Sequence, residues 1–243
     1  MRRRKRGRPI QYTMVDVGAG QKRRYKDWLT EFQGLCIHAI EPHPVLARQL
    51  RHLADELEKD DLTSKKRLKV HEFAATSKDG PCTFYLSNDQ SSSSTLPFIT
   101  DNIRKWRYPL GRRMFKTVDT IEIQGKTLET FCQQESIRGI AFLNIDVQGN
   151  TMGVLEGLTT ADGWNRIKEI NIKVHTIDWD LYEGQSVNYH VLDLCRRRYF
   201  SLQGRSTLSR GQEDVLCFSS DLAAMKGLTS RVGWSKRALM PMA

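Results

Sequence analysis

Asp16, Gly18 and Gly20 place a carboxylate and a Gly-x-Gly turn at the end of the apolar stretch 12–17. Glycine lets the backbone adopt positive φ angles and pass close to a ligand, so this turn predicts a loop that holds a small molecule. Glu41 ends the next apolar stretch, where a carboxylate in nucleotide-binding sheets accepts hydrogen bonds from ribose hydroxyls. Together the two features indicate a ligand that contains a nucleoside.

Two features of the turn distinguish a dinucleotide from a sulfonium cofactor. The dinucleotide fingerprint has a third glycine, whereas this sequence has Arg23 at that position. Asp16 is unfavourable beside a pyrophosphate, but its charge suits the amino group and the sulfonium of S-adenosylmethionine, reached directly or through water. These residues therefore favour S-adenosylmethionine, which becomes S-adenosylhomocysteine after methyl transfer.

Asp146 and His175 are the candidate catalytic residues, because each ends a later apolar stretch predicted to be a strand. Methyl transfer from a sulfonium is an in-line displacement, and a hydroxyl acceptor must lose its proton to a nearby histidine or carboxylate. Two structural alternatives stay open: Asp146 can cap the helix that starts near Asn150, and His175 can simply bond its neighbours. Asp146, His175 and Asp178 can also converge on a cation, but we expect no metal site.

Such side chains require a scaffold of regular elements. Apolar stretches typical of strands alternate with amphipathic stretches typical of helices. This alternation predicts a parallel sheet with helices on both faces, whose ligand lies beyond the carboxyl ends of the strands. We expect strands over 12–17, 36–41, 67–75, 82–88, 116–123, 140–147, 167–176, 199–203 and 213–218, and helices over 26–32, 43–59, 127–135, 150–158 and 187–198.

Five motifs in register extend this interpretation. In order along the chain they are VDVGAG, AIEPHP, HEFAATSKDGPCTFYLSNDQSSSSTL, TLETFCQQESIRGIAFLNIDVQGNTMGVLEGL and INIKVHT. In order and spacing the sequence resembles the FkbM-type S-adenosylmethionine-dependent methyltransferases over about residues 12–220. The resemblance implies an α/β fold of the Rossmann-like class I methyltransferase type, with a seven-stranded, mostly parallel sheet, helices on both faces and an antiparallel last strand. It also implies an oxygen acceptor, commonly a sugar hydroxyl or a polyketide-type product.

The resemblance also implies roles for individual residues. The departures from the family pattern are Lys22 for glycine, Asn144 for lysine, Gln148 for glutamate and Lys173 for glutamate, three of them near the expected acceptor side. The serines at 91–94 are expected to line the acceptor pocket, and a flexible polar loop is an equal alternative for them. The cofactor set is Asp16, Gly18, Ala19, Gly20, Glu41, Pro42, Ala74, Ala75 and Asp146, and the acceptor set is Ser92, Ser93, Ser94, Gln148 and Lys173.

Composition sets the outer limits. The 243 residues predict one methyltransferase domain over 10–222, between a basic N-terminal tail (1–9) and a C-terminal tail (223–243). No stretch is apolar enough for a membrane span, and no secretory leader is visible. The five cysteines are scattered, which argues against a zinc site or a disulfide framework and favours a reducing, cytoplasmic location.

The basic segments and the altered positions suggest two alternative functions. The net charge is +10, and the tail MRRRKRGRP carries much of the excess. The tail, together with the aromatic and basic stretch 104–113, fits an RNA methyltransferase acting on a cap or a ribose 2'-oxygen. We favour the simpler alternatives, a solvated tail and an amphipathic surface segment whose aromatic side chains face the core. The altered positions Asn144, Gln148 and Lys173 fit a non-catalytic binding protein. The expected function is O-methylation of a sugar hydroxyl in a glycan or a glycosylated metabolite, with oligomeric state undetermined.

Overall fold

A seven-stranded sheet with the order β3-β2-β1-β7-β8-β10-β9 forms the centre of the computed structural model, which describes residues 12–20, 24–59, 67–104, 115–175, 180–208 and 213–221. The first five strands in this order run parallel to one another, whereas β10 runs antiparallel to both β8 and β9. This topology confirms the predicted sheet with its antiparallel last strand. The strands are β1 (Tyr12–Val17), β2 (Leu35–Ile40), β3 (Leu68–His71), β7 (Ile140–Ile145), β8 (Ile167–His175), β9 (Phe200–Leu208) and β10 (Glu213–Ser220).

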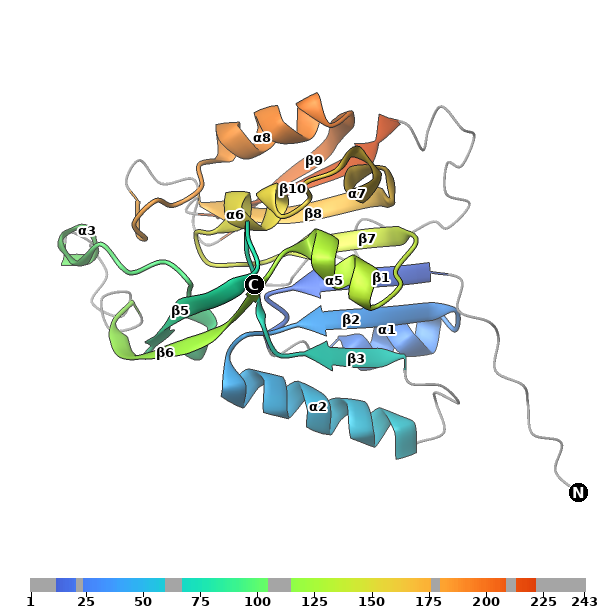
Figure 1. Cartoon of the computed structure of the whole chain (residues 1–243), viewed down its shortest axis with the longest axis horizontal. Helices are drawn as coiled ribbons and strands as arrows, with labels where there is room; N and C mark the ends of the chain where they lie inside the picture. The colour runs from blue at the N-terminus through green and yellow to red at the C-terminus, as the bar shows by residue number, and fades with distance from the viewer. Residues whose placement is uncertain are drawn as a thin grey trace, which may run out of the picture.

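Helices cover both faces of this sheet (Figure 1). On one face, Trp28 and Leu29 of α1 (Tyr25–Glu31) and Leu50 and Leu57 of α2 (Pro44–Lys59) form a core with Met14 and other strand residues. On the other face, a larger core joins the strands to α5 (Leu128–Gln134), α6 (Thr151–Glu156), α7 (Ala161–Asn165) and α8 (Asn188–Arg197). β2 is buried along its whole length because it lies between these two layers.

A second, three-stranded sheet with the order β4-β6-β5 was not predicted as a sheet. It contains β4 (Ala74–Ala75), β5 (Gly80–Ser87) and β6 (Thr117–Lys126). The expected strand 67–75 is wrong as one element. Its pairing with β2 in the main sheet ends at His71, and Ala74–Ala75 pair instead with β6. In Figure 1 the antiparallel strands β5 and β6 project beyond the carboxyl ends of β1, β2 and β3. The second sheet therefore covers the end of the main sheet at which a ligand was expected.

Further differences concern the ends of elements and short helices. β9 extends to Leu208 instead of residue 203, because Glu213 of β10 still pairs with Leu208 there. The short elements η1 (Gln90–Ser92) and α3 (Thr100–Arg104) were not expected. Both predicted tails, Lys22, Arg23, Asp178 and nearly all of the stretch 104–113 lie outside the described residues. No disulfide joins the cysteines, which all fall in the described part, and none of the helices described there has the length and apolarity of a membrane span.

Candidate functional site

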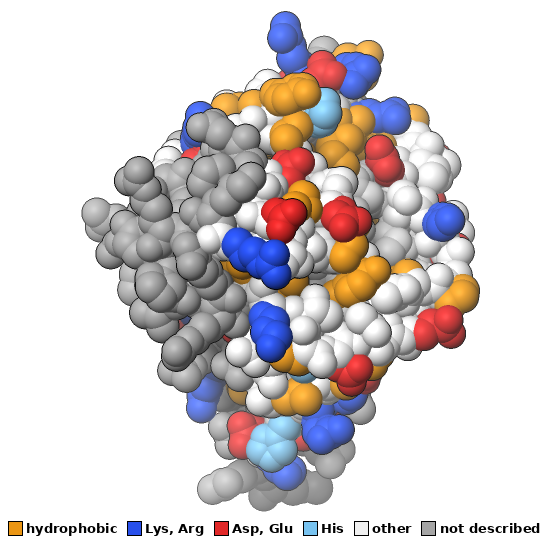
Figure 2. Space-filling model, turned by 90° about the vertical axis from the view of Figure 1, so that its left-hand side faces the viewer, with side chains coloured by type: hydrophobic (Ala, Val, Ile, Leu, Met, Phe, Trp, Pro, Cys, Tyr) orange, Lys and Arg blue, Asp and Glu red, His pale blue; other side chains and the backbone are white. Residues whose placement is uncertain are grey.

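A cavity of about 220 Å³ lies at the carboxyl ends of the parallel strands. The segments that follow β1, β2 and β7 form one side, together with Lys173 of β8. The second sheet forms the opposite side with Ala74, Ala75 and Phe84 and with the segment that follows β5. Figure 2, which views this end of the molecule, shows acidic and basic side chains close together near its centre, with hydrophobic side chains around them. The cavity therefore lies between the two sheets, where the topology predicts a ligand.

The turn after β1 is held close to its neighbouring strands. Gly18 and Gly20 have φ angles of 75° and 53°, and the backbone N–H groups of Gly18 and Ala19 both donate to the carbonyl of Ile40. A Cβ atom on Gly18 would lie 2.2 Å from the backbone oxygen of Asp146. Only glycine fits at this point, because both the positive φ and the approach of the β7 end exclude a side chain.

Glu41 connects the turn to the start of α2. Its Oε2 accepts a hydrogen bond of 2.6 Å from the backbone N–H of Gly20, and its Oε1 accepts one of 2.8 Å from that of His43. The residue is 4 % exposed, and it lines the cavity together with Pro42. A carboxylate oxygen has further lone pairs, so Glu41 remains able to accept hydrogen bonds from a ribose held in the cavity.

Asp16 lies behind the turn and does not line the cavity. It is fully buried, and its two oxygens accept hydrogen bonds of 2.5 Å from the Tyr25 hydroxyl and 2.7 Å from the Asn144 side-chain amide. Burial, and then the neighbouring Asp16 carboxylate, raise the pKa of Tyr25 well above its usual value, so the hydroxyl keeps its proton and donates it. Asp16 was expected to reach a cationic cofactor directly or through water; in this structure it does not line the cavity, and its two hydrogen bonds hold the strand that carries the turn.

The Tyr25→Phe variant tests this support. Removing the hydroxyl leaves a buried carboxylate oxygen without its donor, so we expect the free energy of unfolding to fall by about 1–3 kcal/mol. Chemical denaturation of the full chain measures this loss, and Tyr189→Phe on the exposed side of α8 is the matched control. Equal stability of the two variants would contradict a role for Tyr25 in holding Asp16.

Asp146 and Lys173 form an ion pair on the wall of the cavity. Lys173 Nζ lies 2.6 Å from Asp146 Oδ1, and the two side chains are only 13 % and 21 % exposed. Asn150, not Asp146, occupies the N-cap position of α6. Asp146 Oδ1 is thus engaged by Lys173 in this structure.

The serine segment presents backbone and hydroxyl groups to the cavity. Ser93 and Ser94 line it, whereas the Ser92 side chain donates to Asp89 and the Ser92 carbonyl accepts from the Tyr182 hydroxyl. Ser94 Oγ also donates a hydrogen bond of 2.5 Å to the backbone carbonyl of Gln148. This bond joins the segment to the loop after β7, so two parts of the cavity wall are held together. The structure therefore brings together Ser93, Ser94, Gln148 and Lys173 but not Ser92.

His175 ends β8 outside the cavity wall. It is 7 % exposed, its ring centroid lies 5.9 Å from that of Tyr182, and its backbone pairs with Glu213 of β10. Packing between these elements explains the burial of this histidine. A direct role as a base for a ligand in the cavity therefore has no geometric support in this structure.

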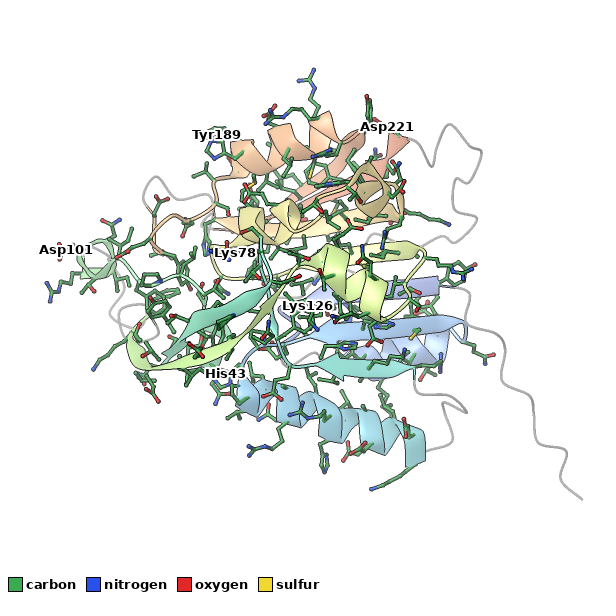
Figure 3. All side chains as sticks on the ribbon, in the orientation of Figure 1. His43, Lys78, Asp101, Lys126, Tyr189 and Asp221 are labelled. Carbon is green, nitrogen blue, oxygen red and sulfur yellow. The ribbon has the colours of Figure 1, made fainter. Side chains whose placement is uncertain are left out.

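Several cavity residues have no sequence signal of function. Phe84 of β5 and Leu46 of α2 supply apolar surface, and Thr95 and Asn150 supply polar groups joined by a hydrogen bond of 2.8 Å. His43, labelled in Figure 3 at the start of α2, packs edge-on against Phe84. The sequence predicts Phe84 only as an ordinary strand residue. Its place in the cavity wall depends on the second sheet, which the sequence does not predict.

Comparison with known proteins identifies the relatives of this chain. The family model described as the methyltransferase FkbM domain matches residues 16–202. A search of curated proteins finds no match.

Three solved structures superpose on this chain, and the first of them supports the fold. The FkbM methyltransferase from Methylobacillus flagellatus KT superposes with a TM-score of 0.53 at 14% identity, covering 87% of this chain and 44% of that one. The mitomycin 7-O-methyltransferase superposes with a TM-score of 0.42 at 13% identity, and the match covers 86% of this chain and 49% of that one. The magnesium protoporphyrin IX methyltransferase from Synechocystis PCC 6803 was solved with S-adenosylmethionine bound. It superposes with a TM-score of 0.44 at 8% identity, and the match covers 87% of this chain and 71% of that one. This chain thus spans less than half the length of the first two proteins.

Proposed function

Because this chain belongs to the FkbM family of S-adenosylmethionine-dependent methyltransferases, we propose that it methylates a hydroxyl oxygen, that of a sugar in a glycan or a glycosylated metabolite. The observation that carries the proposal is the composition of the cavity wall. The glycine turn and Glu41 lie on one side of it, and Ser93, Ser94 and Gln148 lie on another.

The residues of the first side fit S-adenosylmethionine. The turn lines the cavity with Gly18, Ala19 and Gly20, and Glu41 offers a buried carboxylate to ribose hydroxyls. Phe84 and Leu46 offer apolar contact to an adenine ring, in line with the position of Ala74 and Ala75 nearby. These groups bind and orient the cofactor.

The residues of the second side fit a polyhydroxylated acceptor. Hydroxyl and amide groups both donate and accept hydrogen bonds, which matches the mixed donors and acceptors of a sugar. When bound, S-adenosylmethionine supplies an electrophilic methyl group, whose bond to sulfur breaks as the acceptor oxygen bonds to the carbon. The chain has to align the two reactants and exclude water. Asp146, whose Oδ1 pairs with Lys173, orients the acceptor hydroxyl and takes its proton as the oxygen bonds to the methyl carbon.

Transfer of isotope-labelled methyl from S-adenosylmethionine to a panel of sugars, glycosylated metabolites and capped RNA tests the proposal. We expect labelled product with a sugar-bearing acceptor, identified by NMR as an O-methyl group. Label transferred only to RNA would replace the proposed acceptor class. Cofactor binding without transfer to any acceptor would favour the non-catalytic alternative, which the Asp146–Lys173 ion pair motivates.

The Asp146→Asn variant separates orientation from cofactor binding. We expect turnover to fall at least about tenfold, because the neutral amide cannot form the ion pair with Lys173, while the Kd for S-adenosylmethionine changes by less than about threefold. Isothermal titration and initial rates measure the two quantities, with the exposed Asp162→Asn on α7 as the control. Full turnover by Asp146→Asn with unchanged cofactor binding would remove Asp146 from the reaction.

A further inference from the structure

A second cluster of polar side chains lies away from the cavity, on the face of the sheet that α5 covers. His38 projects from β2, His71 projects from the neighbouring edge strand β3, and Glu135 follows the last residue of α5. His38 is 4 % exposed, and none of the three residues lines the cavity. The proposed function makes no use of this cluster.

The geometry of the cluster is close to that of a coordination shell. One nitrogen of each histidine and one oxygen of Glu135 all lie within 4.8 Å of one another. His38 Nδ1 is 3.2 Å from His71 Nε2 and 3.8 Å from Glu135 Oε2. Ligand atoms of a tetrahedral zinc site lie about 3.3 Å apart, as bond lengths of about 2.0–2.2 Å require. Small movements of the partly exposed Glu135 side chain would complete that spacing.

We propose that His38, His71 and Glu135 bind one divalent transition-metal ion of the Zn²⁺ type. Two imidazoles and one carboxylate form a donor set that such ions prefer over Mg²⁺ or Ca²⁺, which take oxygen ligands. The remaining coordination position is open to water from the side on which His71 and Glu135 are partly exposed.

Neighbouring side chains both favour and weaken the binding of a metal ion to this cluster. The Phe131 ring packs edge-on against both imidazoles, at centroid distances of 5.8 and 4.8 Å, which holds the ring planes in place. Lys69 Nζ lies 3.5 Å from Glu135 Oε2 and competes with an ion for that carboxylate. Lys126, which lies over the Phe73 ring, adds positive charge near His71. Binding is therefore expected to be micromolar, and Lys69→Met is expected to strengthen it.

An ion at this place would link the end of α5 to β2 and β3, two strands that already pair with each other in the main sheet. β3 is the edge strand of the main sheet, and β2 leads directly into Glu41 at the cavity. Because the ligands come from β2, β3 and α5, the ion binds the folded chain in preference to the unfolded chain. The ion is thus expected to stabilise the domain without taking part in methyl transfer.

Titration of the tag-free, metal-stripped full chain with ZnCl₂ tests the proposal, with visible absorption of added CoCl₂ as a second measurement. We expect one ion per chain, a rise in Tm of several degrees and a tetrahedral Co²⁺ spectrum. The variants Glu135→Gln and His71→Gln, both at partly exposed positions, should each weaken binding at least about tenfold.

The exposed pair His52 and Glu56 on α2 supplies the matched control, since it has one imidazole 3.4 Å from one carboxylate and no second histidine. His52→Gln should leave the Zn²⁺ affinity within about twofold of the parent protein. Absence of saturable binding by the parent protein would overturn the proposal. Equal affinity of Glu135→Gln, His71→Gln and the parent would also overturn it, because the ion would then bind elsewhere. Neither result depends on methyltransferase activity, so the proposed function is tested separately.

Discussion

The Gly18→Ala variant is expected to lose S-adenosylmethionine binding and to unfold at a markedly lower temperature than the parent protein. Its Cβ would lie 2.2 Å from the backbone oxygen and 2.8 Å from the backbone carbon of Asp146, and neither atom can rotate away. Alanine is also strained at a φ of 75°. Backbone strain and overlap together cost about 3–5 kcal/mol. Denaturation midpoints and titration calorimetry measure the two losses.

Gly139→Ala is the control for this prediction. Gly139 precedes β7, it is exposed, and a Cβ atom there would meet no atom within 4 Å. We expect its stability to stay within about 0.5 kcal/mol of that of the parent. If Gly18→Ala behaved like Gly139→Ala, the close approach of the turn to the end of β7 would not be required.

The Glu41→Ala variant is expected to weaken S-adenosylmethionine binding by roughly 30- to 900-fold. The carboxylate is buried, and hydrogen bonds from ribose hydroxyls to a charged group contribute about 2–4 kcal/mol in total. The variant also leaves the backbone N–H of Gly20 without its side-chain acceptor, which loosens the turn. Isothermal titration with S-adenosylmethionine and S-adenosylhomocysteine measures the effect.

Two further variants make the result specific. Glu41→Gln keeps one oxygen acceptor for the turn but lacks the charge, so its affinity should fall between that of the parent and Glu41→Ala. Glu58→Ala, at an exposed position near the end of α2, should bind the cofactor like the parent. An affinity of Glu41→Ala within threefold of that of Glu58→Ala would show that Glu41 does not contact the ligand.

The main sheet could be predicted from the sequence because its signals are local. Continuous apolar stretches mark β1, β2 and β7, and a turn with two glycines marks the point where the first strand ends. The position of Glu41 follows from this pattern, since parallel strands end at the same edge. The third strand is extended furthest beyond its observed end, to residue 75 instead of His71, because Ala74 and Ala75 are apolar in either sheet.

The rest of the site depends on contacts between distant segments, which a single sequence does not contain. Asp16 carries the same charge whether it meets a ligand or the Tyr25 hydroxyl, and only the packing of α1 decides between them. The ion pair between Asp146 and Lys173 requires the register of β7 and β8. The cluster of His38, His71 and Glu135 joins three elements with no recognisable ligand spacing along the chain.

The position of β1 between β2 and β7 has a consequence for the order of folding. Its hydrogen-bonded partners come from the next strand and from a strand more than a hundred residues later, as the contact of Asp16 with Asn144 across 128 positions illustrates. During synthesis one edge of β1 stays open until β7 has left the ribosome, so this edge is exposed to wrong pairing for most of translation. Such non-local pairing also slows refolding. We infer that a ligand of the cavity assists only the last stage of folding, after β7 has joined β1.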